Sequence, residues 1–167
     1  MKVLKTAFDF DINKKSKFTL LGSWCLKNNS NILKEIDSYE IVPYHWDDKK
    51  KFREDYEYLT NLYEKKLKQC TEILNEIHST KKNIRYWRII IGPWLRFFID
   101  SLFDRYECIN YANKHVNEIT YDIHRYNQDI SASDFPEFYN NLTLDAWNEI
   151  IFSECIKFLK INNATTD

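Results

Sequence analysis

Apolar residues recur at alternating steps of three and four between residues 52 and 77, which is the spacing of one face of an α-helix. Asp47 or Asp48 can cap the start of such a helix, because a carboxylate accepts hydrogen bonds from the N–H groups of the first turn. Trp46 would pack back on the helix as a hydrophobic staple. We therefore predict a long amphipathic helix from about residue 48 to residue 78.

A second apolar segment follows. Residues 84–91 should form one or two helical turns, and Pro93 after Gly92 should break or kink them, because proline cannot donate a backbone hydrogen bond. A new amphipathic run then presents one apolar face, which comprises Leu95, Phe98, Ile99, Leu102, Phe103 and Tyr106. Since neither apolar face can be buried alone, we expect residues 86–106 to pair with the long helix in antiparallel.

Three short segments have the composition of β-strands: residues 17–26, 39–44 and 118–126, the last in competition with an extended helix. Pro43 should end the second strand, and Gly22 would lie at the end of the first. Residues 31–38 are predicted as a short helix or irregular structure. Ser133 or Asp134 and then Thr143 can cap two final helices, at about 134–141 and 144–160.

These elements predict an α/β fold that is helix-rich, with a small parallel sheet of two to four strands flanked by long helices. The chain has 167 residues, a length that corresponds to one domain. We expect a single domain over residues 1–167, with loosely ordered ends at 1–16 and 161–167.

Composition excludes several classes of function. With only two glycines, Gly22 and Gly92, the chain has neither a phosphate-binding loop nor a dinucleotide fingerprint. A net charge of -1 argues against nucleic acid as a partner. No segment is apolar and long enough for a transmembrane helix or a signal peptide, so we expect a cytoplasmic protein. The four cysteines lack the spacing of a metal site, and we predict reduced core thiols, no metal and no cofactor.

The densest group of chemically active side chains lies between the second strand and the long helix, in the sequence PYHWDD at residues 43–48. Histidine is the residue type most often used as an acid or base, and an aspartate could accept the proton of a hydroxyl group, so His45 and Asp47 are both candidate catalytic residues. Trp46 and Asp48 are candidate substrate-binding residues. The alternative is structural: the carboxylates cap the helix, the indole packs, and His45 bonds a backbone carbonyl.

Two arginines form a second candidate site. Arg85 and Arg88 are three residues apart, so they share one helix face and could hold a carboxylate or phosphate. In the alternative interpretation they pair with acidic residues of the long helix. Gly22 and Trp24 are further candidates for substrate binding, because glycine lets backbone approach a ligand closely. Since parallel strands end at one edge of a sheet, we expect all these groups to meet in one cleft.

The segments LLGSWC, VPYHWDDKKKFREDYEYLTNLYEKKL and RYWRIIIGPW resemble the N-terminal part of a family of sugar transferases encoded in bacterial surface-carbohydrate loci. The resemblance covers about residues 17–112. Members of that family are several times longer and similar to glycosyltransferases with two Rossmann-like halves, of which the C-terminal half holds the nucleotide-sugar donor. The resemblance implies that this chain is an incomplete N-terminal half of such an enzyme, either truncated or one piece of a split protein.

The resemblance implies the acceptor-side part of a transferase that moves a sugar from a nucleotide-sugar donor to a bacterial surface glycan. His45 or Asp47 would act as the general base, and Arg85 with Arg88 would neutralise acidic groups. The partners would be the nucleotide sugar, the glycan acceptor and a C-terminal partner half. The alternative function is a non-catalytic helical module that binds another protein.

Overall fold

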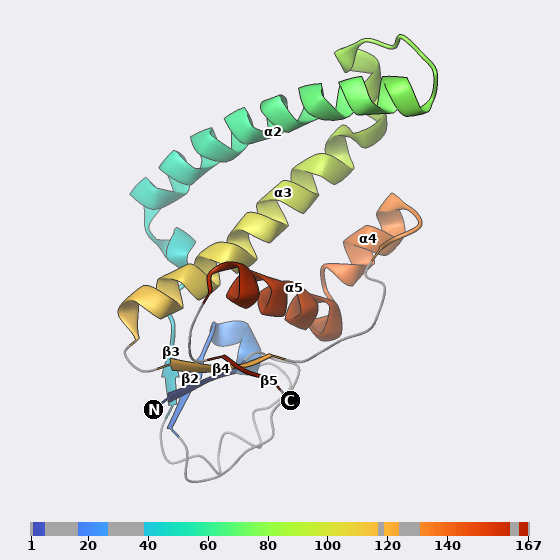
Figure 1. Ribbon diagram of the computed structural model, residues 1–167. Coiled ribbons are helices and arrows are strands. Elements are labelled where there is room, and N and C mark those ends of the chain that lie inside the picture. Colours follow the sequence, from blue (N-terminus) through green and yellow to red (C-terminus); the bar gives the residue numbers. More distant parts are fainter. Residues whose placement is uncertain are drawn as a thin grey trace. The chain divides into compact units, whose positions relative to one another are not determined.

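The computed structural model describes residues 2–5, 17–26, 39–116, 119–123, 131–160 and 164–166 (Figure 1). It divides into two compact units. The first unit combines residues 1–45 with residues 104–167, and the second comprises residues 46–103. That the whole chain forms one domain remains a prediction.

In the described part of the first unit, a parallel sheet has five strands in the order β3-β2-β1-β4-β5. The strands are β1 (Lys2–Lys5), β2 (Lys17–Leu20), β3 (Tyr39–Ile41), β4 (Ile119–Ile123) and β5 (Ala164–Thr166). Together with the helices they confirm the predicted helix-rich α/β fold. The sheet has five strands where we predicted two to four.

The predicted strands β2, β3 and β4 lie inside the segments that the sequence indicates. The first is shorter than predicted, because the chain leaves the sheet after Leu20 and forms the 3₁₀-helix η1 (Ser23–Leu26). Leu20 pairs with Ile41, and the N–H of Val42 donates to the carbonyl of Leu20 at 2.9 Å. β2 and β3 therefore end side by side. The predicted element at 31–38 lies outside the described residues.

The two outer sequence segments contribute β1 and β5, which we did not predict, since we expected loosely ordered ends. Both strands are short, and β5 consists of one alanine and two threonines, so neither shows the alternation of apolar residues that identifies a strand. Their place in the sheet rests on backbone hydrogen bonds to β2 and β4, which do not depend on side-chain type.

The second unit is a helical hairpin whose first helix, α2 (Lys49–Ile77), confirms the predicted long helix. Asp48 is its N-cap, and the carboxylate accepts from the N–H groups of Lys50 at 2.8 Å and Lys51 at 3.3 Å. This bonding satisfies donors that a helix start leaves without intrahelical partners.

We predicted a break or a kink at Pro93; the break is wrong, because α3 (Ile84–His115) is one continuous helix with Pro93 inside it, and the kink remains a prediction. Pro93 deprives the carbonyl of Ile89 of its helical donor, but Ile89 is 70% exposed and water can satisfy that oxygen. Gly92 explains the close approach of the two helices: a Cβ there would lie 2.7 Å from the hydroxyl oxygen of Tyr63.

The antiparallel pairing of the two helices is confirmed within the second unit. Leu59 and Leu67 of α2 form a buried cluster with Leu95 and Ile99 of α3. At one end Tyr58 contacts Phe103, with ring centroids 5.8 Å apart, and at the other the indole N–H of Trp87 donates to Asn75 at 3.0 Å. The predicted apolar face is narrower than expected, because Leu102 is 40% exposed.

The described part of the first unit also contains the helices α4 (Phe135–Asn141) and α5 (Asp145–Phe158). Asp134 caps α4 as predicted, accepting from the N–H of Glu137 at 2.8 Å. Thr143 does not cap α5: its hydroxyl donates to the carbonyl of Asn140 at 2.7 Å, and Leu144 occupies the N-cap position. α5 lies beside β4 in this unit (Figure 1).

Among the described residues, no helix combines the length and the apolar character needed to cross a bilayer. The four cysteines are free thiols, of which Cys25, Cys108 and Cys155 are buried and Cys70 is half-buried. Burial raises the pKa of both Cys25 and Cys155 to about 11, so these thiols stay protonated at neutral pH.

Candidate functional site

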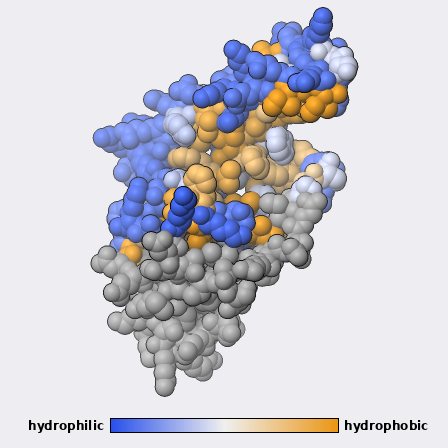
Figure 2. All heavy atoms as spheres, viewed as in Figure 1, coloured by the Kyte–Doolittle hydropathy of each residue, from blue (hydrophilic) through white to orange (hydrophobic). Residues whose placement is uncertain are grey.

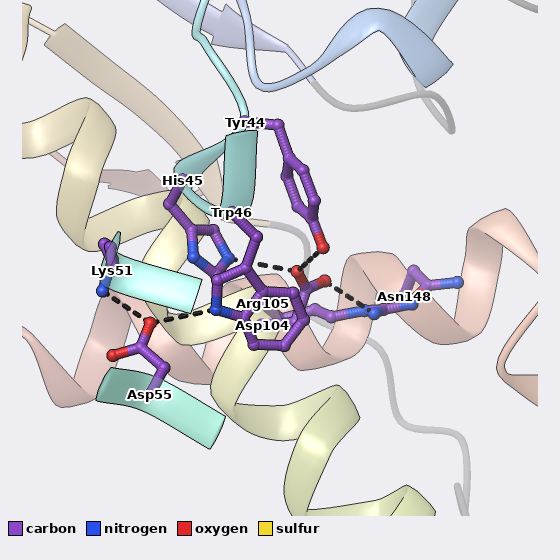
Figure 3. Close-up of polar contacts among 8 residues, drawn as sticks. All are labelled: Tyr44, His45, Trp46, Lys51, Asp55, Asp104, Arg105 and Asn148. Atoms are coloured by element: carbon purple, nitrogen blue, oxygen red, sulfur yellow. Dashed lines mark hydrogen bonds and ion pairs between the residues drawn. The ribbon is translucent and has the colours of Figure 1, made fainter. Parts of the chain in front are cut away.

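A cluster of polar side chains follows the end of β3, and Asp104 is at its centre (Figure 3). The chain leaves β3 at Ile41 and enters the 3₁₀-helix η2 (His45–Asp47). The hydroxyl of Tyr44 donates to Oδ1 of Asp104 at 2.7 Å, and Nε2 of His45 lies 3.1 Å from the same oxygen. All three residues belong to the first unit.

The other carboxylate oxygen of Asp104 is bonded as well. Nη1 of Arg105 donates to Oδ2 at 2.8 Å, and Nε of Arg105 donates to Oδ1 of Asn148 at 2.9 Å. The amide of Asn148 in turn donates to the carbonyls of Leu142 and Leu144, both at 2.9 Å, at the start of α5. The cluster thus joins α3 to the segment after β3 and to α5.

These contacts set the charge of Asp104. Burial by itself would raise the pKa of the Asp104 carboxyl, but the hydrogen bonds from His45 and Tyr44 and the charge of Arg105 outweigh it and hold the pKa below its ordinary value. Burial and the bond to Asp104 raise the pKa of Tyr44. Asp104 is therefore an anion at neutral pH and Tyr44 a neutral hydrogen-bond donor.

The members of the cluster differ in their access to solvent. The imidazole of His45 is fully buried, whereas the Asp104 side chain is 14% exposed and Tyr44 is 36% exposed. Tyr44 and part of Asp104 are therefore open to solvent, whereas the imidazole of His45 contacts Asp104 and not solvent.

Gly22 and Trp24 lie near this cluster, after the end of β2. A Cβ at Gly22 would overlap the six-membered ring of Trp24, so the indole occupies the space that the glycine leaves open. The Trp24 ring meets Tyr44 edge to face, with centroids 6.5 Å apart. The structure thus brings three predicted site residues, Gly22, Trp24 and His45, to the same edge of the sheet.

We expect Gly22→Ala to lower the free energy of unfolding by about 2 kcal/mol, because the new methyl group forces the Trp24 ring out of its position. Urea unfolding measures the change. The double variant Gly22→Ala/Trp24→Ala should be no less stable than Trp24→Ala alone, since the clash is then gone. Additive losses in the double variant would contradict this explanation.

Trp46, Asp47 and Asp48 belong to the second unit. Trp46 donates from Nε1 to Asp55 at 2.9 Å and stacks on Phe103 with centroids 6.3 Å apart, so it packs within the hairpin. Asp48 caps α2, and Asp47 is exposed. For Trp46 and Asp48 these contacts match the structural alternative; their part in substrate binding remains a prediction.

Arg85 and Arg88 also lie in the second unit. Arg88 forms a two-pronged ion pair with Glu64 of α2, at 2.6 and 2.7 Å, which is the pairing that the structural alternative predicts. The hydrogen bonds of this pair lower the pKa of Glu64 and raise that of Arg88. Arg85 is exposed. That the arginines share one cleft with His45 remains a prediction.

One described group has the donor atoms of a metal site: His45, Asp104 and Cys108, whose ligand atoms lie within 4.8 Å of one another. Burial, followed by the charge of Asp104, raises the pKa of the Cys108 thiol, and a metal ion binding there would have to displace its proton. His45 and Asp104 are joined directly, with Nε2 of His45 3.1 Å from Oδ1 of Asp104.

Asp104, Arg105 and Asn148 are not among the site residues predicted from the sequence. Asp104 and Arg105 fall among the charged positions of an amphipathic helix, where such residues are usually solvated, and 59 positions separate His45 from Asp104. The signal that the sequence does contain is the location of Tyr44 and His45 directly after a strand of a parallel sheet, where ligands commonly bind.

The family model for the LIC12162 family transferase matches residues 1–167. No curated protein and no solved structure matches the chain. Because the family match spans the whole chain, this protein belongs to the LIC12162 transferase family.

Proposed function

We propose that this protein is the acceptor-side part of a transferase that moves a sugar from a nucleotide-sugar donor to a bacterial surface glycan in the cytoplasm. Membership of a transferase family supports group transfer, and the resemblance of the 17–112 region supports sugar as the group. The observation that carries the proposal is the anionic Asp104, held by Tyr44 and His45 at the carboxyl edge of a parallel sheet.

In the proposed reaction an acceptor hydroxyl binds beside Tyr44 and Asp104, on their solvent-exposed side. Its oxygen attacks the anomeric carbon of the donor, the bond from that carbon to the diphosphate oxygen breaks, and the nucleoside diphosphate leaves with the electron pair. The proton of the hydroxyl passes to the carboxylate of Asp104. A carboxylate can take this proton because the hydroxyl becomes strongly acidic as its oxygen bonds to carbon.

This mechanism changes the role that sequence analysis gave to His45. Since the imidazole is fully buried, we propose His45 as a positioning residue that fixes Asp104, not as the base itself. Asp47 is exposed and remains the alternative candidate for the base, and Arg85, also exposed, remains a candidate for neutralising acidic groups of the acceptor or donor. We propose that a C-terminal partner half holds the nucleotide.

The test is transfer activity of the chain together with its partner half, followed as nucleoside diphosphate released from a panel of nucleotide sugars. We expect His45→Ala to lower kcat by about 100-fold with the fold intact, the size of effect that follows when a catalytic group is misplaced by about 1 Å. Glu154→Gln, at an exposed residue of α5, is the control and should retain full activity. Unchanged transfer by His45→Ala would reduce His45 to a structural residue.

A non-catalytic interaction module is the second candidate, favoured by the exposed apolar residues of the hairpin, among them Ile77 at 67% and Ile89 at 70%. A module would release no nucleoside diphosphate with any donor or partner half. It would instead be retained by a partner protein encoded beside it.

A further inference from the structure

The distal end of the hairpin, where α2 passes into α3, presents apolar residues to solvent. On α3, Tyr86, Ile89 and Ile90 are 41%, 70% and 56% exposed. Tyr86 precedes the buried Leu95 by nine residues and Ile90 precedes the buried Ile99 by nine, which is about half a turn around the helix axis. α3 is therefore apolar on two opposite sides, and Figure 2 shows hydrophobic residues gathered on the visible face of the hairpin.

The same end of the hairpin is basic. Residues 77–99 contain five Lys or Arg residues and no acidic residue. Two of the five form ion pairs within the second unit: Arg88 with Glu64 and Arg96 with Asp100. The other three, Lys81, Lys82 and Arg85, are exposed and take part in no ion pair within the described part of the chain.

The nearest acidic residues of α2 do not neutralise this end. Glu72 and Glu76 follow the buried Leu67 by five and nine residues, so they lie about 140° and 180° around the helix from it. They face away from the side of α2 that packs on α3. The basic and apolar residues, by contrast, lie together: Nζ of Lys82 is 5.2 Å from the centre of the Tyr86 ring.

We propose that this surface, the distal patch of Lys81, Lys82, Arg85, Tyr86, Ile89 and Ile90, binds the surface of an anionic lipid bilayer. Aliphatic and aromatic side chains next to Lys and Arg are the features by which helices lie in a membrane interface. The isoleucines would enter the acyl boundary, Tyr86 would lie at headgroup level, and the cations would contact lipid phosphates. This proposal does not rest on the proposed sugar transfer, and Arg85 is the one residue named in both.

Co-sedimentation of the chain with phosphatidylcholine vesicles, with and without phosphatidylglycerol, tests the proposal. Binding should require the anionic lipid and weaken as salt is added. Lys81→Glu/Lys82→Glu should reduce binding roughly tenfold or more, since each cation near an anionic surface contributes to attraction. The matched control Lys49→Glu/Lys50→Glu changes two exposed lysines at the other end of α2 and should bind better than the distal variant.

The apolar part is tested separately. Ile89→Ser/Ile90→Ser should lower vesicle binding, whereas Phe158→Ser, at a 76% exposed residue of the first unit, should not. Circular dichroism confirms that the variants are folded. Vesicle binding that is absent, or that both distal variants leave unchanged, would overturn the proposal. So would self-association that Ile89→Ser/Ile90→Ser abolishes in the absence of vesicle binding, because the patch would then contact protein.

Discussion

Leu67→Asp is expected to unfold the α2–α3 hairpin, with a loss of about 5 kcal/mol or more. Leu67 is fully buried in the cluster with Leu59, Leu95 and Ile99. Truncating a buried leucine costs about 2–5 kcal/mol, and a carboxylate without a partner at the same place adds the cost of a buried charge. This sum is comparable to the whole stability of a typical domain.

Hydrogen exchange of the α2 amides locates the effect, because local unfolding of the hairpin removes their protection whether or not the sheet unit unfolds as well. Lys66→Asp is the control: it introduces the same side chain one residue away, at an exposed position, and should keep the protection of α2 nearly unchanged. Equal protection of α2 in the Leu67 variant would show that the hairpin core does not stabilise these helices.

The hairpin could be predicted from the sequence because its stability resides in a repeating pattern. Steps of three and four place residues on one face of any helix, so the pattern predicts both helices and their pairing. The cap was predicted from a carboxylate directly before the first helix, at Asp47 or Asp48. Pro93 shows where local signals fail. The hydrogen bond that proline removes costs free energy locally. Ile91 before it and Leu95 after it both pack in the cluster shared with α2, and this packing keeps the helix continuous.

The sheet and the candidate site were less predictable for a different reason. Strand β5 is defined by its neighbour and not by its own residues, so no pattern within Ala164–Thr166 reveals it. Asp104 meets Tyr44 and His45 only when a helix and a strand end separated by some 60 residues come together. The sequence could indicate the edge of the sheet where His45 lies, but not the carboxylate that it contacts.

Asp104→Asn is expected to lower the free energy of unfolding by about 2–4 kcal/mol at pH 7. The substitution keeps the shape of the side chain but removes the charge that Tyr44, His45 and Arg105 stabilise, and hydrogen bonds to a charged group contribute about 1.5–3 kcal/mol. Tyr44 and Arg105 donate to different oxygens of Asp104. Asparagine has only one side-chain oxygen, and its amide nitrogen is a donor, so one of these two hydrogen bonds is lost.

The acid dependence of stability identifies the charge as the cause. Since the folded state holds the pKa of Asp104 below its ordinary value of 3.8, the unfolded chain binds the proton more readily. The stabilisation is therefore complete above that pH and is lost as the pH falls through the lower, folded pKa.

Urea unfolding over a pH series should show the wild type approaching the Asp104→Asn variant below about pH 4, as expected when this proton is bound. In Asp47→Asn, which changes an exposed carboxyl, the full acid-dependent loss should remain. Wild-type and Asp104→Asn curves that stay parallel throughout the acid range would contradict an ionised Asp104 at the centre of the cluster.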